Sequence, residues 1–205
     1  FCSILEYNNY PRYKKYMKVI CCIPVHMGSK RLHGKILMEI AGKPVLQHTI
    51  EAVAKAIKVN EIWVCATTNP EDDAIAEFLQ PKGKQKFYDI HFMRGDEDDI
   101  ISRLVRVAND TQADYIINVD GEDLLTDPRM IDKTVEVLEL GYPFVGFRGL
   151  PLGISPIGFS KVKLKEVYAK NNATIEEWWK LFVSEESYSI DTKEDLERIK
   201  KVLEQ

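Results

Sequence analysis

Two glycines and three cations follow the first apolar run of the chain. The glycines are Gly28 and Gly34, and the cations are Lys30, Arg31 and Lys35. Glycine lets backbone N–H groups approach phosphate oxygens closely, while arginine binds phosphate through its forked guanidinium and lysine as a point charge. On charge alone, a solvated basic loop is an equally good interpretation. A Walker A loop is excluded, because isoleucine stands where that motif needs serine or threonine after its lysine.

Four acidic residues follow a later apolar run, residues 115–119. They are Asp120, Glu122, Asp123 and Asp127. Carboxylates at the carboxyl end of a strand are natural ligands for Mg²⁺, a hard cation that prefers oxygen. The alternative is a solvated acidic turn in which Asp127 caps the next helix, and spacing alone favours that alternative.

A further aspartate, Asp191, follows a short apolar run near the end of the chain. It is a second candidate metal ligand. It, or Thr192, is equally suited to cap a helix whose first turn contains Glu194 and Asp195, because acidic groups are favourable at a helix N-terminus.

Short apolar runs bounded by turn signals alternate with segments of helical periodicity. Such runs predict buried parallel strands, and apolar residues spaced three and four apart predict helices. The predicted strands are Val19–Val25, Glu61–Ala66, Ile90–Met93, Tyr115–Val119, Phe144–Phe147 and Tyr188–Ile190. The predicted helices are 44–57, 69–79 with Asn69 as its cap, 96–108 with Asp96 as its cap, 128–140, 160–169, 174–183 and 192–203.

This alternation predicts an α/β fold, a three-layer αβα sandwich with a mostly parallel twisted sheet. Ligands of such sheets bind beyond the carboxyl ends of the strands. The rule directs attention to the loops after Val25, Val119 and Ile190. We therefore expect the basic loop, the acidic turn and Asp191 to face a common site.

Composition narrows the class of protein. A chain of 205 residues with a formal charge of −4 fits one domain and argues against a general nucleic-acid binder. We interpret residues 1–16 as an N-terminal extension and 17–205 as the domain. No apolar stretch is as long as a membrane span, residues 1–16 are too polar for a signal peptide, and the cysteines and histidines show no zinc spacing. These features predict a cytoplasmic protein with reduced cysteines and without nucleic-acid or membrane partners.

Residues 23–35 resemble the signature of the cytidylyltransferases that activate acidic sugars, which include the CMP-Kdo and CMP-sialic acid synthetases and, most similar here, the spore-coat polysaccharide type. The family pattern is close to Ile-Pro-Ala-Arg-x-Gly-Ser-x-Arg-Leu-Pro-Gly-Lys, and this chain reads Ile-Pro-Val-His-Met-Gly-Ser-Lys-Arg-Leu-His-Gly-Lys. The segments that resemble the continuation of the family are 42–50, 66–73, 94–99, 116–128 and 189–196. Among the departures of this chain from the family pattern, His26 replaces arginine, His33 replaces proline, Asp120 replaces glutamine, Glu122 replaces aspartate and Leu124 replaces proline.

The resemblance implies a nucleotide-diphospho-sugar transferase-like fold of the GT-A, Rossmann-like kind. It implies that the loop 26–35 wraps the triphosphate of CTP, with Arg31 and Lys35 as the catalytic phosphate contacts. It also implies Mg²⁺ as the cofactor, held by Glu122 and Asp191. The nucleotide-binding residues that it implies are Pro24, Val25, His26, Gly28, Ser29, Lys30, Arg31, Lys35, Thr67, Arg103 and Asp120.

These features predict a nucleotidyltransferase that moves CMP from CTP onto an acidic sugar or a related small acid and releases pyrophosphate. The partners are then CTP and a small acidic acceptor, and a homodimer is open because family members are often dimers. The loop 151–159 lacks the acids of the family, which leaves the acceptor open. One alternative is a nucleotide-binding module of the same fold without transferase activity. Another is a GT-A-type glycosyltransferase, for which Asp120-Gly121-Glu122 only partly matches the expected Asp-x-Asp motif.

Overall fold

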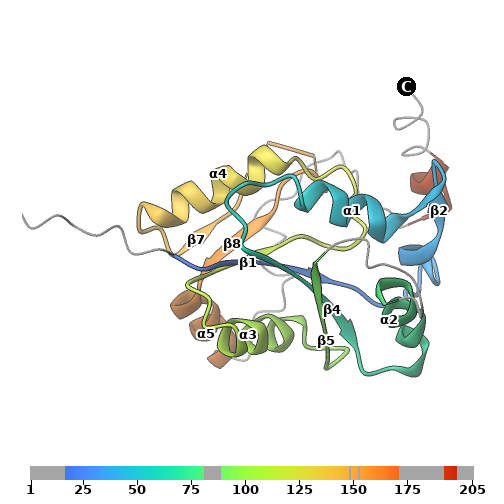
Figure 1. Cartoon of the computed structure of the whole chain (residues 1–205), viewed down its shortest axis with the longest axis horizontal. Coiled ribbons are helices and arrows are strands. Elements are labelled where there is room, and N and C mark those ends of the chain that lie inside the picture. Colours follow the sequence, from blue (N-terminus) through green and yellow to red (C-terminus); the bar gives the residue numbers. More distant parts are fainter. Residues whose placement is uncertain (1–16, 81–88, 148, 152, 171–191, 198–205) are drawn as a thin grey trace, which may run out of the picture.

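The computed structural model describes most of the chain as a sheet between two layers of helices (Figure 1). The described residues are 17–80, 89–147, 149–151, 153–170 and 192–197. The extension predicted for residues 1–16, the helix predicted for 174–183, the strand predicted for 188–190 and Asp191 itself lie outside them.

A six-stranded sheet in the order β5-β4-β1-β6-β8-β7 forms the middle layer. The first four strands in that order are parallel, and β8 is antiparallel to both its neighbours. All residues of β1 are buried, which explains its continuous apolar sequence and confirms the prediction of a mostly parallel sheet. The strands are β1 (Val19–Pro24), β4 (Glu61–Thr67), β5 (Ile90–Gly95), β6 (Tyr115–Asn118), β7 (Phe144–Val145) and β8 (Ile157–Ser160).

The last two strands differ from the sequence prediction. The predicted strand Phe144–Phe147 is shorter and lies at the edge of the sheet, while β8 takes the place beside β6. Gly158 in β8 lies directly under a helix, since a Cβ atom there would come within 2.3 Å of the Thr134 methyl group. A local apolar pattern does not say which strand pairs with β6. The close contact between β8 and the helix that carries Thr134 requires glycine at position 158.

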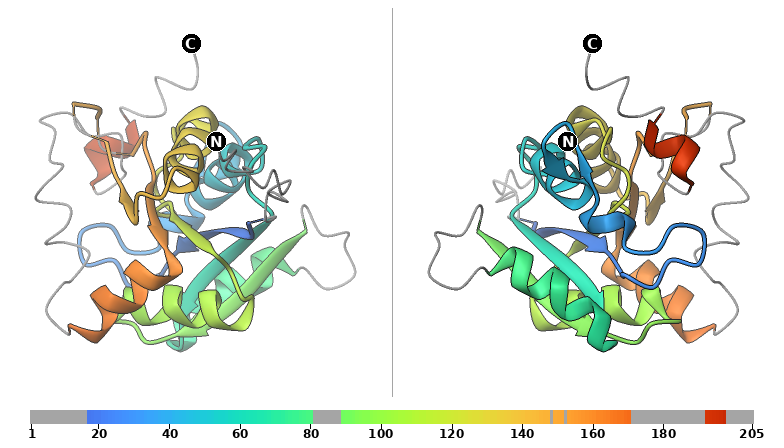
Figure 2. Two further views of the ribbon diagram at one scale, coloured as in Figure 1. Left: turned by 90° about the vertical axis from the view of Figure 1, so that its left-hand side faces the viewer. Right: turned by 90° about the vertical axis from the view of Figure 1, so that its right-hand side faces the viewer.

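Helices cover both faces of the sheet, as Figure 2 shows from its two ends. Successive side chains of a strand point to opposite faces, so Cys21 and Ile23 join one core while Ile20 and Cys22 join the other. The predicted αβα sandwich is therefore confirmed. One face is covered by α1 (Val45–Val53) and α4 (Pro128–Glu139), the other by α3 (Ile100–Asp110) and α5 (Lys161–Ala169), with η2 (Pro70–Asp72) and α2 (Asp73–Leu79) following β4.

One predicted helix cap is wrong, and a second, Asn69, has the predicted position but lacks a side-chain capping hydrogen bond. Asp99, not Asp96, caps α3, because its carboxylate accepts a hydrogen bond from the backbone N–H of Ser102 at 2.8 Å. Asp96 instead accepts a hydrogen bond from the backbone N–H of Asp99, so it closes the preceding turn. Asn69 makes no side-chain cap and donates its amide to Glu97. Several neighbouring acids have suitable chemistry, and the turn geometry decides which one becomes the cap.

A small apolar cluster joins segments that are far apart in the sequence. It lies by the 3-10 helix η1 (Lys35–Leu37) and the antiparallel pair β2 (Glu39–Ile40) and β3 (Lys43–Pro44). Its buried members are Leu32, Ile40, Val45 and Leu124, and Leu196 packs against them. The basic loop, the acidic turn and the segment that follows Asp191 therefore share one apolar support.

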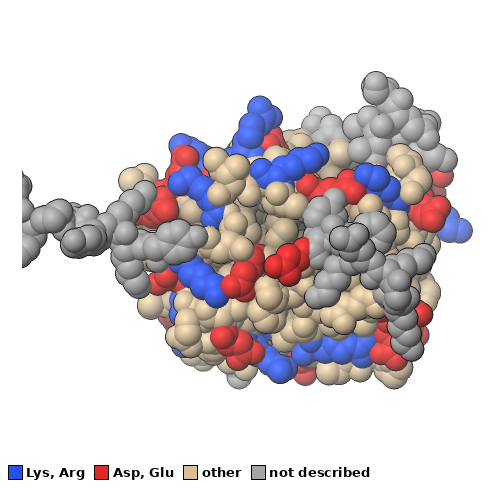
Figure 3. All heavy atoms as spheres, in the orientation of Figure 1, with Lys and Arg blue, Asp and Glu red and all other residues tan. Residues whose placement is uncertain are grey.

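The visible surface carries both signs of charge. Lys and Arg side chains are interspersed with Asp and Glu on the face drawn in Figure 3. That face has no continuous basic stripe of the kind by which nucleic-acid-binding domains are recognised. In the described part of the chain, no helix has the length and apolar character needed to cross a membrane.

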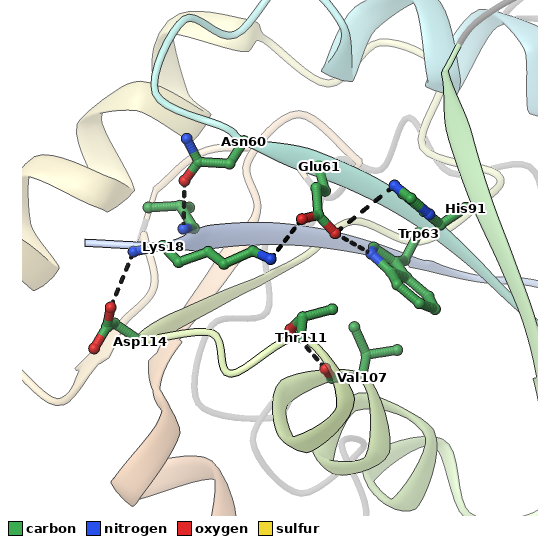
Figure 4. A network of polar contacts seen from close by, with 9 residues as sticks. Lys18, Asn60, Glu61, Trp63, His91, Val107, Thr111 and Asp114 are labelled. Atoms are coloured by element: carbon green, nitrogen blue, oxygen red, sulfur yellow. Dashed lines mark hydrogen bonds and ion pairs between the residues drawn. The ribbon is translucent and has the colours of Figure 1, made fainter. Parts of the chain in front are cut away.

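A polar network holds the amino ends of β1 and β4 together (Figure 4). Glu61 lies 2.6 Å from the Lys18 ammonium and accepts a hydrogen bond from the Trp63 indole at 2.9 Å. The His91 ring stacks on Trp63 with a centroid distance of 4.8 Å. Burial alone would raise the pKa of Glu61, but the hydrogen bonds from Lys18 and Trp63 and the charges of Lys18 and His91 outweigh it and lower that pKa.

We predict that Glu61→Gln destabilises the fold by about 0.5–1 kcal/mol at neutral pH. Because the folded-state pKa of Glu61 is lowered, its contribution is complete above the unfolded value of about 4.3 and is lost as pH falls through the folded value. The difference in melting temperature between wild type and variant should therefore shrink between pH 5 and pH 3. Glu39→Gln, at an exposed position on β2, is the control. A difference that stays constant over this range contradicts the assignment.

Candidate functional site

The carboxyl ends of β1, β4 and β6 form one edge of the sheet, where three loops begin. Backbone hydrogen bonds tie these loops together. The N–H of Val25 donates to the carbonyl of Cys65 at 3.1 Å, and the N–H of Gly121 donates to the carbonyl of Pro24 at 3.2 Å. The basic loop and the acidic turn predicted from sequence are therefore neighbours, as the rule for parallel sheets requires.

The basic loop is closed by its own backbone. The N–H groups of Ser29 and Gly34 both donate to the carbonyl of Met27, each at 2.9 Å. Gly34 has a φ of 68°, in the left-handed region that favours glycine. The closed loop leaves Lys30 and Arg31 exposed.

The other residues predicted on this loop are less open. His26 and Gly28 are half-buried. Ser29 is 8% exposed, and its hydroxyl accepts a hydrogen bond from the backbone N–H of Leu32 at 3.4 Å. Pro24 and Val25 are buried at the strand end, and their backbone groups are bonded to neighbouring segments, so direct contact of either residue with a nucleotide stays a prediction.

An ion pair joins the basic loop to the acidic turn. The Lys35 ammonium lies 2.8 Å from Oε1 of Glu122. The Lys35 side chain is 2% exposed, whereas that of Glu122 is 20% exposed. A buried ammonium needs such a partner, because an uncompensated charge is costly in a medium of low dielectric constant. Two of the residues predicted to act on phosphate and metal are thus in direct contact.

Glycine at position 121 allows the acidic turn to lie against β1. A Cβ atom there would come within 2.4 Å of Cγ1 of Val25 and 3.2 Å of the Pro24 carbonyl oxygen. The hydroxyl of Thr49, on α1, donates to the Gly121 carbonyl at 2.7 Å. The backbone on both sides of Glu122 is therefore positioned by packing as well as by charge.

The four acids of the turn have different surroundings. Asp120 accepts a hydrogen bond from the Asn118 amide at 3.1 Å, and Asp123 is 3% exposed. Asp127 caps α4 by accepting from the backbone N–H of Arg129 at 2.9 Å, and hydrogen bonds from Arg129 lower its pKa. The helix-capping alternative is thus right for Asp127, while Glu122 belongs to the Lys35 ion pair.

Two predicted nucleotide-binding residues lie below the loop. Thr67 is fully buried, and Arg103 is 2% exposed, with Nη1 donating to the carbonyls of Cys65 at 2.7 Å and Val25 at 3.4 Å. Burial lowers the pKa of the Arg103 guanidinium, and the thiol of Cys65 and nearby carboxylates, including that of Asp72, oppose the shift. In the described structure both side chains support strand ends, and direct contact with a nucleotide stays a prediction.

Asp72 is a buried residue of this edge that the sequence analysis did not single out. It is 1% exposed and accepts hydrogen bonds from Met27 and Thr67. Its position in an acidic helix start made it resemble a cap. A signal available in the sequence was its place in segment 66–73, which resembles the family continuation.

The predicted metal ligands are only partly described. Among the described residues, no three Asp, Glu, His or Cys side chains gather as they would around a metal ion. Asp191 lies outside those residues. Leu196, in the last described segment, packs against Leu32 of the basic loop and Leu124 of the acidic turn.

Comparisons with known proteins identify the family of the chain. The model of the cytidylyltransferase family matches residues 20–177. A 3-deoxy-manno-octulosonate cytidylyltransferase of Trichlorobacter lovleyi is 34% identical over 137 residues, which are 67% of this chain and 49% of that protein. An uncharacterized protein of Methanocaldococcus jannaschii is 30% identical over 153 residues, 74% of this chain and 60% of the relative. The chain thus spans about half to three fifths of the length of these relatives.

Solved structures share the fold. A cytidylyltransferase from Leptospira borgpetersenii superposes with a TM-score of 0.77 at 23% identity, covering 92% of this chain and 87% of that one. A CMP:2-keto-3-deoxy-manno-octonic acid synthetase complexed with CTP gives a TM-score of 0.69 at 20% identity, covering 92% and 99%. The fold is therefore that of nucleotidyltransferases, as the sequence predicted. Since the family model matches well over half of the chain, the protein belongs to the cytidylyltransferase family.

Proposed function

We propose that the protein transfers CMP from CTP onto an acidic sugar or a related small acid and releases pyrophosphate. The observation that carries the proposal is the contact between Lys35 of the basic loop and Glu122 of the acidic turn, at the carboxyl edge of the sheet. Family membership supports it, as do the 3-deoxy-manno-octulosonate cytidylyltransferases among the relatives.

The triphosphate would bind on the closed loop. Arg31 and Lys30 are exposed there and can approach phosphate oxygens from solvent. Lys35 is already desolvated and lies beside a carboxylate, so an incoming phosphate can replace Glu122 as its partner without new desolvation of the ammonium. These cations would offset the charge that develops on the phosphoryl oxygens as the acceptor oxygen bonds to the α-phosphorus and pyrophosphate departs.

The carboxylates fit a magnesium ion that arrives with the nucleotide. Mg²⁺ in such sites is commonly held by one or two carboxylates together with substrate phosphates. Glu122 is partly exposed and Asp120 lies two residues before it, so both offer oxygen at the edge where the phosphates would lie. Glu122 and Asp191, with Asp120 nearby, are the residues that would hold the ion. When bound, it would act as a Lewis acid on the phosphoryl oxygens.

The compartment and assembly of the protein belong to the same proposal. Cys21, Cys22 and Cys65 are free and buried, which is compatible with the reducing cytoplasm. A homodimer remains a prediction from the family resemblance.

We predict that Arg31→Ala, Lys35→Ala and Asp191→Asn each lower turnover by about a hundredfold or more, because the first two remove a cation that would contact the phosphates and the third removes a carboxylate that would hold Mg²⁺. The measurement is pyrophosphate release from CTP with Mg²⁺ and a panel of sugar acids. Lys133→Ala, exposed on α4, is the control and should retain wild-type rates. Near-wild-type turnover in the three variants contradicts the site assignment. Specific binding of CTP without pyrophosphate for any acceptor would instead indicate a binding module.

We predict further that the Lys35–Glu122 pair contributes to folding. Glu122→Gln should lower the free energy of unfolding by about 1–3 kcal/mol, since it leaves a buried ammonium with a weaker partner. A double-mutant cycle with Lys35→Met, followed by urea unfolding, should give a coupling energy above about 0.5 kcal/mol. The exposed pair Lys133 and Glu136, 3.1 Å apart, is the matched control. Equal coupling in both pairs shows that burial adds nothing to the first.

A further inference from the structure

We propose that Asp72 is the positioning residue of the phosphate-binding loop. Its buried carboxylate ties Met27 of the loop to the end of β4, and Arg103 ties β4 to the residue that follows β1. The inference rests on the proposed function, because it gives Asp72 a part in nucleotide binding. It concerns a side chain that itself lies out of reach of the ligand.

Asp72 divides its two oxygens between two segments. Oδ1 accepts a hydrogen bond from the backbone N–H of Met27, in the loop, at 2.7 Å. Oδ2 accepts from the backbone N–H and the hydroxyl of Thr67, at the end of β4, both at 2.7 Å. The carboxylate is therefore a bridge between the first residues of the loop and the neighbouring strand.

The bridge continues into the loop through Met27. The carbonyl of Met27 accepts the hydrogen bonds from Ser29 and Gly34 that close the loop. A shift of Met27 would therefore move the closed part of the loop and the cations Lys30 and Arg31 that it presents. Small displacements of this kind are costly for binding and catalysis, since near-attack geometry depends on them.

Arg103 complements this arrangement with the opposite charge. Its guanidinium donates to the carbonyls of Val25 and Cys65, while Asp72 accepts from Met27 and Thr67. Asp72 thus connects the loop to the end of β4, and Arg103 connects β4 to the residue that follows β1. The two charges also stabilise each other, because the carboxylate of Asp72 opposes the effect of burial on the Arg103 guanidinium.

The carboxylate does not serve as a ligand for substrate or metal. Asp72 is 1% exposed and Arg103 is 2% exposed. Three donors at 2.7 Å already occupy the carboxylate oxygens. These hydrogen bonds and the nearby charge of Arg103 stabilise the ionised carboxylate in its buried position.

Asp72→Asn tests the inference, because an amide offers only one oxygen and places N–H donors against either Met27 or Thr67. We expect the dissociation constant for CTP with Mg²⁺ to rise about tenfold or more. Thr67→Val removes one of the three hydrogen bonds to the Asp72 carboxylate and should raise the dissociation constant for CTP about threefold. Val135→Ala, on the buried face of α4, is the control for lost stability and should bind CTP as wild type does.

Hydrogen exchange of residues 26–34 without nucleotide is the second readout. Exchange should accelerate in Asp72→Asn and not in Val135→Ala, because only the former releases the loop from β4. If Asp72→Asn folds poorly, the Thr67→Val variant carries both measurements. Wild-type affinity and exchange in Asp72→Asn and Thr67→Val, or equal losses in Val135→Ala, overturn the positioning role. A wild-type protein that binds no nucleotide while its loop exchange still responds to Asp72→Asn refutes the proposed function instead.

Discussion

The ion pair between Lys35 and Glu122 joins two segments that are 87 residues apart in the sequence. Lys35 is almost completely buried, and a buried ammonium is tolerated only with a charged or strongly hydrogen-bonding partner. Glu122 supplies such a partner, so this contact stabilises the approach of the acidic turn to the basic loop. The packing of Gly121 against Val25 imposes the same approach sterically, so charge and shape agree at this point.

Two buried charged side chains near this edge of the sheet form hydrogen bonds with backbone groups. Asp72 collects N–H and hydroxyl donors, and Arg103 supplies donors to carbonyls at the ends of β1 and β4. Parallel strands end with backbone groups that no further strand pairs, and such groups are costly when buried without partners. Here side chains bond to several of them, and the loop is thereby tied to β4. A rigid support of this kind is what a site for a flexible triphosphate requires.

The errors of the sequence analysis lie where several residues share the same chemistry. Asp96 and Asp99 are both suitable caps, and only the path of the turn makes Asp99 the one that meets Ser102. The family resemblance implied Thr67 and Arg103 as nucleotide contacts, which stay predictions, and the sequence could not show that both side chains are buried. Asp72 looked like one acid in a helix start, since nothing local reveals that Met27 lies beside it.

The sequence by itself determined the α/β class, the mostly parallel sheet and the segments that form its functional edge, because hydrophobic periodicity and turn residues are local properties of the chain. It also predicted the basic loop and the acidic turn as the parts of the candidate site. Only the tertiary structure decided that Lys35 is buried against Glu122, that β8 inserts beside β6, and that Asp72 connects the loop to β4. These are contacts between distant segments, and their energies depend on burial and three-dimensional approach, which a one-dimensional pattern does not contain.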